Sequence, residues 1–586
     1  MYKILGSVNE PKDIKKLNIN ELEDLAKDIR TAILNKVSKT GGHFGPNLGV
    51  VEATIALHYV FDSPHDKLVF DVSHQSYPHK ILTGRKDYFI KDELLTKVSG
   101  FSSPKESIHD IFATGHTSTS ISQALGLAKA RDLKNDSYKV LAFIGDGAIS
   151  GGQALESLNI AGDYEGPLLI IVNDNEISIA ENHGGIYKSL RDLRKSHGSS
   201  SNNIFKAFGL DYVYEENGND ISSMIKALKD LKDIKKPTVL HIHTLKGKGY
   251  ALAEKDGETW HSREAFDLKT GKDLKEKSTD LTYKDFTRTY IMEKAKADKD
   301  FMVLSPAMPR SVGLDKKDRE ILGDQYLDTG IAEEACISMA AGLGKNGAKP
   351  LVVTNATFMQ RAYDQVSQDL SLNEAPATIL LIKSGFESAK DMTHLGIFTI
   401  SIFSNVPNLV LLCPTSIREY KNMLDWSLDQ KDHPVMILIP GNEVTDRDAD
   451  KDFSEINKFK LEEKGEKVAI IGLGDYFQKG EALAQYIEEK LGFKPSLINP
   501  RFASGVDKNL LEDLKKDHDL VITMENGILD GGFGQKIASF YAPSTMKVLS
   551  YGLEKTFYDR YKPEEVLYDL GFTKEHILEE IKILLD

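Results

Sequence analysis

Short apolar runs of strand length alternate with helix-like segments along nearly the whole sequence, and this alternation restricts the chain to α/β architectures. The runs fall into three groups. The first group is Lys139–Ile144, Leu168–Val172 and Thr238–Ile242. The second is Leu351–Thr354, Thr378–Ile382 and Leu409–Leu412, and the third is Lys467–Gly472, Lys494–Ile498, Leu520–Met524 and Met546–Leu549. Because strands that alternate with helices form parallel sheets covered by helices, we predict three doubly wound α/β domains with mostly parallel sheets.

Two charge-rich, weakly apolar stretches predict where these domains meet. The stretches Asp267–Asp285 and Asn442–Lys467 resemble linkers more than core elements. A chain of 586 residues is long enough for three or four domains. We therefore predict domains at residues 1–275, 280–445 and 460–586.

Charge, cysteine content and apolar runs exclude several classes of protein. The balance of 74 Lys+Arg against 88 Asp+Glu gives a net charge of −14, which argues against a non-specific nucleic-acid surface. The two cysteines, Cys336 and Cys413, lie far apart in segments that resemble a buried helix or strand, so we expect neither a disulfide framework nor a CxxC site. The longest apolar runs are strand length, and the N-terminus lacks the apolar core of a signal peptide. We expect a soluble cytoplasmic protein that binds neither nucleic acid nor membranes.

The most informative motif is a Gly-Asp-Gly at the end of a predicted strand. It places Asp146 after one strand, and Asn175 follows the next. Open parallel sheets bind ligands beyond the carboxyl ends of their strands, and glycine there lets backbone N–H groups approach a diphosphate. Asp146, Asn175 and the backbone carbonyl of Ile177 would supply the oxygen ligands that Mg²⁺ prefers. A plain Gly-Asp turn is the structural alternative, and Asn173 is a competing ligand.

Further segments carry a family resemblance. They are Gly41–Phe61, Asp71–Arg85, Thr114–Ser122, Asp328–Glu334 and Ala356–Gln365. Together with the Gly-Asp-Gly motif and the asparagine that follows it, they resemble the 1-deoxy-D-xylulose-5-phosphate synthases, a family of transketolase-like thiamine diphosphate enzymes. The resemblance covers nearly the whole chain. It implies a diphosphate-binding domain, then a pyrimidine-binding domain, then a domain of the transketolase C-terminal type, assembled as a homodimer.

The resemblance also implies roles for individual residues. Asp146 and Asn175 match the metal ligands. The residues that match cofactor contacts are His74, Gly115, His116, Thr117, Gly147, Ala148, Asn175 and Tyr250. Glu333 matches the glutamate that bonds a ring nitrogen of the aminopyrimidine, and Phe358 matches the aromatic residue that stacks on that ring.

The implied reaction removes carbon dioxide from pyruvate and joins the remaining two carbons to D-glyceraldehyde 3-phosphate. The cofactor carries the difficult step. Burial should raise the pKa of Glu333, which suits a group that exchanges a proton with the ring, although an acidic residue that caps a helix is the simpler interpretation. His43, His261 and His394 match active-site histidines that donate protons to developing alkoxides. Structural hydrogen bonding is the alternative for each histidine.

The sequence departs from the family where the phosphate of the aldehyde should bind. Lys383 stands where the family has an arginine, and Lys390 where it has an aspartate. If the alignment is shifted by one residue, Asp391 takes the place of that aspartate. The segment Pro434–Glu443 contains no arginine where one is expected, while Arg361 is retained. Lysine binds phosphate as a point charge without the rigid fork of arginine.

Two alternatives to a synthase of this kind stay open. The first is a paralogous transketolase-type enzyme with a different donor or acceptor, which the lost arginines favour. The second is the decarboxylating subunit of a 2-oxo acid dehydrogenase complex, which needs a partner. The presence of both half-sites in one chain argues against the second.

Overall fold

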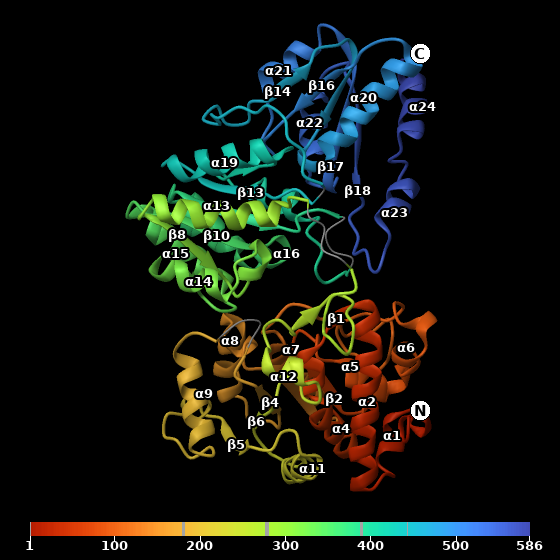
Figure 1. Ribbon diagram of the computed structural model, residues 1–586, viewed down its shortest axis with the longest axis vertical. Helices are drawn as coiled ribbons and strands as arrows, with labels where there is room; N and C mark the ends of the chain where they lie inside the picture. Colours follow the sequence, from red (N-terminus) through yellow and green to blue (C-terminus); the bar gives the residue numbers. More distant parts are fainter. Residues whose placement is uncertain (1, 178–181, 276–279, 387–390, 442, 586) are drawn as a thin grey trace. The chain divides into compact units, whose positions relative to one another are not determined.

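The computed structural model describes residues 2–177, 182–275, 280–386, 391–441 and 443–585. Backbone contacts divide the chain into two compact units, which are described separately below. Unit 1 is Met1–Ser278 with Gly330–Ala332, and unit 2 is Thr279–Thr329 with Glu333–Asp586. Figure 1 shows the elements of both.

Unit 1 is built on a parallel sheet in the order β2-β3-β4-β6-β5. Its strands are β2 (Lys67–Phe70), β3 (Val140–Gly145), β4 (Leu169–Asp174), β5 (Asp211–Glu215) and β6 (Thr238–His243). The short strands β1 (Gly42–His43) and β7 (Ser262–Arg263) pair separately in antiparallel register. β3 and β4 are neighbours, so the residues that follow them share one edge of the sheet.

Helices cover both faces of this sheet. They are α1 (Pro11–Ile14), α2 (Ile19–Thr40), α3 (Gly45–Gly49), α4 (Val51–Val60), α5 (Tyr77–Lys80), α6 (Asp87–Ile90), α7 (Ser120–Lys134), α8 (Gly152–Gly162), α9 (Gly185–Lys195), α10 (Ile204–Ala207), α11 (Ile221–Asp230) and α12 (Ala251–Lys255). Successive strand residues point to opposite faces. Leu141 and Phe143 therefore share a core with α2, α4 and α11, while Ala142 and Ile144 share one with α7, α8 and α9.

The long helix α2 shows how the local sequence determines where a helix begins and ends. Asn18 accepts a hydrogen bond from the backbone N–H of Glu21, and the Glu21 side chain accepts one from the N–H of Asn18, which forms a capping box at the start of α2. The helix ends at Gly41, which has a φ of 71° and leads into β1. His43 is the second residue of β1, which follows this turn directly.

Unit 2 contains two sheets. The first is parallel, in the order β12-β13-β11-β10-β8-β9. Its strands are β8 (Phe301–Ser305), β9 (Tyr326–Asp328), β10 (Lys349–Asn355), β11 (Ala377–Ile382), β12 (Val410–Leu412) and β13 (Pro434–Leu438). Its helices are α13 (Tyr283–Ala297), α14 (Lys316–Leu322), α15 (Glu333–Lys345), α16 (Ala356–Met359), α17 (Tyr363–Gln365), α18 (Thr399–Phe403) and α19 (Ile417–Asp429).

The second sheet of unit 2 has the order β14-β16-β15-β17-β18, and only the edge strand β14 is antiparallel to its neighbour. The strands are β14 (Lys460–Glu463), β15 (Lys467–Gly472), β16 (Ser496–Asn499), β17 (His518–Ile528) and β18 (Lys547–Leu553). The helices are α20 (Phe477–Leu491), α21 (Lys508–Leu514), α22 (Phe533–Tyr541), α23 (Pro563–Asp569) and α24 (Lys574–Leu585). One hydrophobic core joins both sheets, from Ile379 of the first to Val521 of the second.

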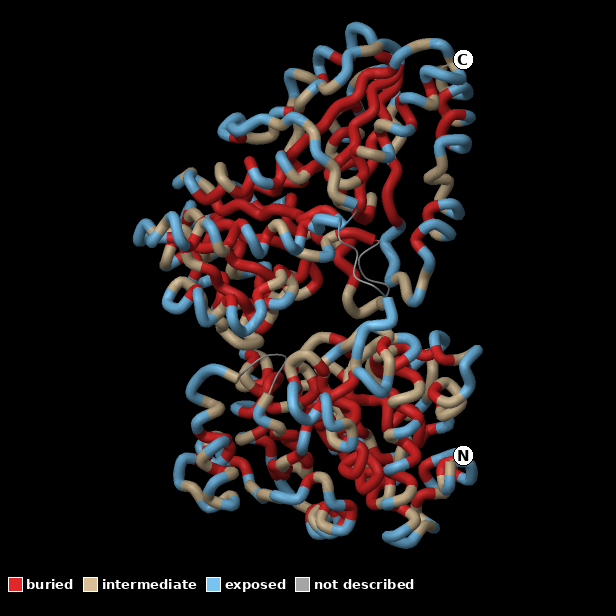
Figure 2. The backbone as a smooth tube through the Cα atoms, in the orientation of Figure 1, coloured by how far each residue is buried: buried red, intermediate tan, exposed pale blue. Residues whose placement is uncertain are grey.

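The prediction of mostly parallel α/β sheets is confirmed. In Figure 2 the central strands of the sheets are buried, whereas the edge strands β5, β9 and β14 are half-buried or exposed. β14 lies inside the charge-rich stretch interpreted as a linker, so that stretch includes one edge strand. The predicted domain limits stay a prediction. Among the described residues, no helix combines the length and apolarity needed to cross a bilayer.

Candidate functional site

The predicted metal ligands follow adjacent strands of unit 1. Asp146 comes directly after β3 and Asn175 directly after β4, and the N–H of Asp146 donates to the carbonyl of Asn173 at 3.0 Å. Asp146 is 2% exposed. Burial, with the nearby Asp174 carboxylate, raises the pKa of Asp146 to about 7. A bound cation would stabilise the ionised carboxylate at this position.

Two asparagines near this edge differ in the hydrogen bonding of their side-chain amide oxygens. Oδ1 of Asn175 is buried and has no hydrogen-bond partner among the residues that the structure describes. Oδ1 of Asn173, the competing candidate, accepts a hydrogen bond of 2.6 Å from Thr244. An orphaned buried oxygen fits a missing ligand partner, so the residues present fit a hard cation held by oxygen ligands.

Lys246 lies at this site and was not predicted from the sequence. Its Nζ is 3.4 Å from the carbonyl oxygen of Ile177 and 3.2 Å from Nδ1 of His261. Burial lowers the pKa of Lys246 to about 8, against the opposing effect of Asp146. This lysine therefore links the predicted metal ligands to a predicted catalytic histidine.

The glycine-rich turn after β3 lies beside the loop that precedes α7. Ser118 donates its backbone N–H to Asp71 at 2.7 Å and its hydroxyl to the carbonyl of Ala148 at 2.7 Å. A Cβ added to Gly151 would lie 2.2 Å from the Ser118 hydroxyl oxygen. The structure therefore brings Gly147 and Ala148 next to the segment that contains Gly115, His116 and Thr117. Of these predicted cofactor contacts, Gly115, Gly147 and Ala148 are buried and the other two are half-buried.

Three predicted histidines of unit 1 form a cluster, although they lie far apart in the sequence. The ring of His43 is 5.1 Å from that of His74 and 5.7 Å from that of His261. The rings of His74 and His261 stack at 5.3 Å. β1 and β7 pair His43 with Ser262, and this pairing brings the two ends of the cluster together.

Tyr250 lies in a neighbouring aromatic cluster. Its ring is 5.3 Å from Phe44 and 5.0 Å from Trp260, and its hydroxyl donates to the carbonyl of Leu268 at 3.1 Å. The contact predicted for Tyr250 with the cofactor stays a prediction.

Two predicted residues of unit 2, Glu333 and Arg361, lie close together. Glu333 begins α15 and is 5% exposed. Burial raises its pKa to about 7, while Arg361 opposes this rise. Nη1 of Arg361 lies 3.7 Å from Oε2 of Glu333, and within the described part of the chain that oxygen has no hydrogen-bond partner. Glu333 is therefore a buried acid and not the solvated cap that the simpler interpretation predicted.

Phe358 and His394 lie side by side in the same unit. Their rings are 5.5 Å apart in an edge-on arrangement. Nδ1 of His394 is 2.8 Å from the hydroxyl of Thr393, which donates to Asp391 at 2.6 Å. Lys383 follows β11, is exposed and has a φ of 57°. Lys390 lies outside the described residues.

A buried hydrogen-bonded chain behind Asn175 was also missed. Asp174 accepts hydrogen bonds from Arg194 and, at 3.0 Å, from Nε2 of His241, whose Nδ1 is 2.8 Å from the Tyr212 hydroxyl. The available signal was His241, a titratable residue within the apolar run of β6, because a polar side chain in a buried strand needs a hydrogen-bond partner. This chain fixes the backbone that carries Asn175.

Three family models match consecutive parts of the chain. They are described as 1-deoxy-D-xylulose-5-phosphate synthase, at residues 5–201 and 193–244; the transketolase pyrimidine binding domain, at 280–446; and the transketolase C-terminal domain, at 457–577. The last two confirm the prediction of transketolase-like domains.

Curated relatives match along their whole length. The 1-deoxy-D-xylulose-5-phosphate synthase of Lachnoclostridium phytofermentans is 36% identical over 621 residues, which cover 99% of this chain and 99% of that protein. The synthase of Alkaliphilus oremlandii is 36% identical over 626 residues, with 99% of each covered. That of Caldanaerobacter subterraneus is 35% identical and covers 99% of this chain and 98% of the relative.

Proposed function

This chain belongs to the 1-deoxy-D-xylulose-5-phosphate synthase family, and from that membership we propose which of its side chains carry the reaction. The chain is a thiamine diphosphate-dependent transferase that joins pyruvate and D-glyceraldehyde 3-phosphate to give 1-deoxy-D-xylulose 5-phosphate and carbon dioxide. The product serves isoprenoid and thiamine biosynthesis. The observation that carries this conclusion is identity of about one residue in three over 99% of the chain.

Unit 1 is proposed to hold the diphosphate and Mg²⁺. Asp146, Oδ1 of Asn175 and the carbonyl of Ile177 would ligate the ion, supported by the orphaned Asn175 oxygen. The backbone at Gly147 and Ala148 would approach the phosphates, together with His74 and the segment Gly115–Thr117.

Unit 2 is proposed to hold the aminopyrimidine ring. Glu333 would share a proton with a ring nitrogen, and its pKa of about 7 suits both directions of that exchange near neutral pH. Phe358 would stack on the ring. Bound thiamine diphosphate supplies the carbon nucleophile and takes up the electrons released with carbon dioxide.

The histidines are proposed to move protons at substrate oxygens. His43 and His261 would donate to the alkoxide that forms from the keto group of pyruvate, and His394 to the alkoxide that forms from the aldehyde. The phosphate of the acceptor would bind Arg361, Lys383 and Lys390. Because no arginine lies at the end of β13, an acceptor other than D-glyceraldehyde 3-phosphate is the second candidate.

The remaining assignments are also proposals. We expect a cytoplasmic homodimer with three domains at residues 1–275, 280–445 and 460–586. Sedimentation of the purified chain tests the dimer.

The roles of the two units are separable by experiment. Glu333→Ala should leave Mg²⁺-dependent binding of inorganic pyrophosphate unchanged and abolish pyruvate turnover, because only the proton exchange is lost. Asp146→Ala should abolish the binding itself. If Glu333→Ala turned pyruvate over at the normal rate, the role proposed for this carboxyl would be wrong.

A further inference from the structure

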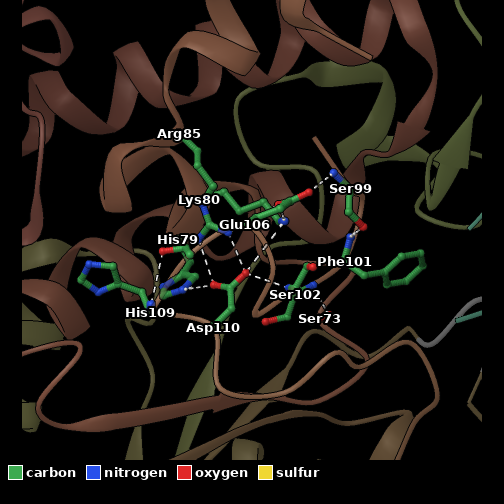
Figure 3. Close-up of polar contacts among 12 residues, drawn as sticks. Ser73, His79, Lys80, Arg85, Ser99, Phe101, Ser102, Glu106, His109 and Asp110 are labelled. Atoms are coloured by element: carbon green, nitrogen blue, oxygen red, sulfur yellow. Dashed lines mark hydrogen bonds and ion pairs between the residues drawn. The ribbon is translucent and has the colours of Figure 1, made fainter. Parts of the chain in front are cut away.

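A cluster of buried charges lies beside an irregular loop of unit 1, residues 99–110 (Figure 3). Nζ of Lys80 lies 2.5 Å from Oε2 of Glu106. Arg85 donates two hydrogen bonds to Asp110, at 2.6 and 2.9 Å, and Nε2 of His79 lies 3.0 Å from the same carboxylate. The side chains of Lys80 and Asp110 are 0% exposed, and that of Arg85 is 5% exposed.

Stability alone does not explain this cluster. Moving charges out of water costs several kcal/mol for each ion, and apolar replacements of buried ion pairs are often neutral or stabilising. Burial raises the pKa of Asp110, but the hydrogen bonds from Arg85 and His79 outweigh it and hold that pKa well below the usual carboxyl range. Asp110 is therefore ionised. We look for the reason for this buried charge in the groups that Asp110 binds.

Each carboxylate also binds the backbone of the loop. Oε1 of Glu106 accepts from the N–H of Ser99 at 2.7 Å, and Oδ2 of Asp110 accepts from the N–H of Ser103 at 2.8 Å. Between these anchors the N–H of Ser102 donates to the hydroxyl of Ser73 at 2.7 Å. The loop is thus fixed on both sides of residue 101 without helix or strand hydrogen bonds.

The residue between the anchors touches the histidine cluster. Phe101 is 7% exposed, and its ring lies 5.4 Å from that of His43 at 72°. Ser73, which holds the adjacent Ser102, directly precedes His74. The loop therefore forms a fixed apolar wall beside two histidines of the proposed site.

We propose that the pairs Lys80–Glu106 and Arg85–Asp110 act as a clamp that holds Phe101 against His43 and so sets the orientation of the His43 imidazole. Phe101, Glu106 and Asp110 are positioning residues, since they act through His43. This proposal rests on the role proposed above for His43. The clamp accounts for charged side chains where an apolar core would suffice for folding.

A double-mutant cycle tests the path from the charges to the histidine. Glu106→Gln keeps the shape of the side chain and removes its charge, and Phe101→Leu leaves the charges intact. Each should lower kcat about 10- to 100-fold, because an ångström-scale misplacement of a catalytic group has an effect of that size. The affinity for thiamine diphosphate with Mg²⁺ should change less than about threefold. In the Phe101→Leu background, Glu106→Gln should have almost no further effect on kcat.

A matched control separates positioning from lost stability. Asp66 is also a buried carboxylate that accepts from two backbone N–H groups, those of Asp62 and Lys139, at 2.8 Å each. It directly precedes β2, whereas His79 and Lys80 lie in α5, which follows that strand. Asp66→Asn should lower the melting temperature while leaving kcat within about twofold.

A spectroscopic readout separates failure of this proposal from failure of the role of His43. The imidazole resonances of His43, assigned with His43→Gln in histidine-labelled enzyme, should shift in Glu106→Gln and Phe101→Leu but not in Asp66→Asn. If His43→Gln kept full turnover, the catalytic role would be wrong while the shifts still reported the clamp. Unchanged His43 resonances in both clamp variants, or equal losses of kcat in the presence and absence of His43, would overturn the clamp.

Discussion

Nη1 of Arg361 lies 3.7 Å from Oε2 of Glu333, a buried carboxyl oxygen that accepts no hydrogen bond from any described residue. Burial raises the pKa of Glu333 from 4.5 to about 7, and Arg361 limits that rise. The arrangement keeps the carboxyl near the midpoint of its titration at neutral pH. The same arrangement makes the fold less stable than it would be with a neutral side chain.

Glu333→Gln should stabilise the protein at alkaline pH while abolishing turnover. Between pH 4.5 and 7 the folded carboxyl binds a proton that the unfolded one has lost, so the free energy of unfolding falls as pH rises, by up to about 3 kcal/mol. Glutamine removes this fall. Urea unfolding at pH 5 and pH 8 should show a gain for the variant at pH 8 that is absent at pH 5. An equal effect at both values would contradict a raised pKa.

Arg361→Gln should move the titration of Glu333 upward. Without the guanidinium the ionised carboxylate loses its nearby cation, so the folded pKa rises above about 7 and the fall in stability extends to higher pH. The pH dependence of unfolding free energy measures this shift. Arg361→Lys, which retains the charge, should restore most of the original profile, and a profile unchanged in Arg361→Gln would show that the two groups do not interact.

Asn175 and Asn173 should differ in their effect on Mg²⁺. Asn175→Ala removes an oxygen that has no hydrogen-bond partner among the described residues. Mg²⁺-dependent binding of thiamine diphosphate should therefore weaken about 10- to 100-fold with little change in stability. Asn173→Ala removes the partner of Thr244 and should lower stability more than Mg²⁺ affinity. Mg²⁺ titrations followed by near-ultraviolet circular dichroism compare the two. The reverse order would make Asn173 the ligand.

Lys383 should contribute to recognition of the acceptor phosphate. Lys383→Ala should lower the ratio of kcat/KM for D-glyceraldehyde 3-phosphate over D-glyceraldehyde about 3- to 10-fold, because only the phosphorylated aldehyde loses a charge contact. The exposed Lys345, at the last turn of α15, provides the control, and its replacement by alanine should leave the ratio unchanged. A ratio unaffected by Lys383→Ala would place the phosphate elsewhere.

The sequence predicted the parallel sheets because buried strands read as continuous apolar runs. The run Leu168–Val172 corresponds to β4, Leu169–Asp174. It did not predict β14, Lys460–Glu463, since an exposed edge strand alternates polar and apolar residues and resembles a linker. The sequence likewise indicated Asp146 and Asn175, which follow adjacent strands.

Contacts between distant segments could not be predicted. Lys246 reaches Ile177 and His261 only because the strand order places β6 beside β4. The ring packing of His43 against His261 depends on the pairing of β1 with β7, which are too short to give a periodic pattern. A side chain that acts through tertiary proximity leaves no local signal.

The most direct test of the central claim is pyruvate-dependent release of carbon dioxide by the purified chain with thiamine diphosphate and Mg²⁺, with and without D-glyceraldehyde 3-phosphate, and with the product identified by mass. We predict release that the aldehyde stimulates and a product with the mass of a deoxypentulose phosphate. Release without stimulation would contradict the assignment of the acceptor. No release under any condition would contradict the assignment of pyruvate as the donor.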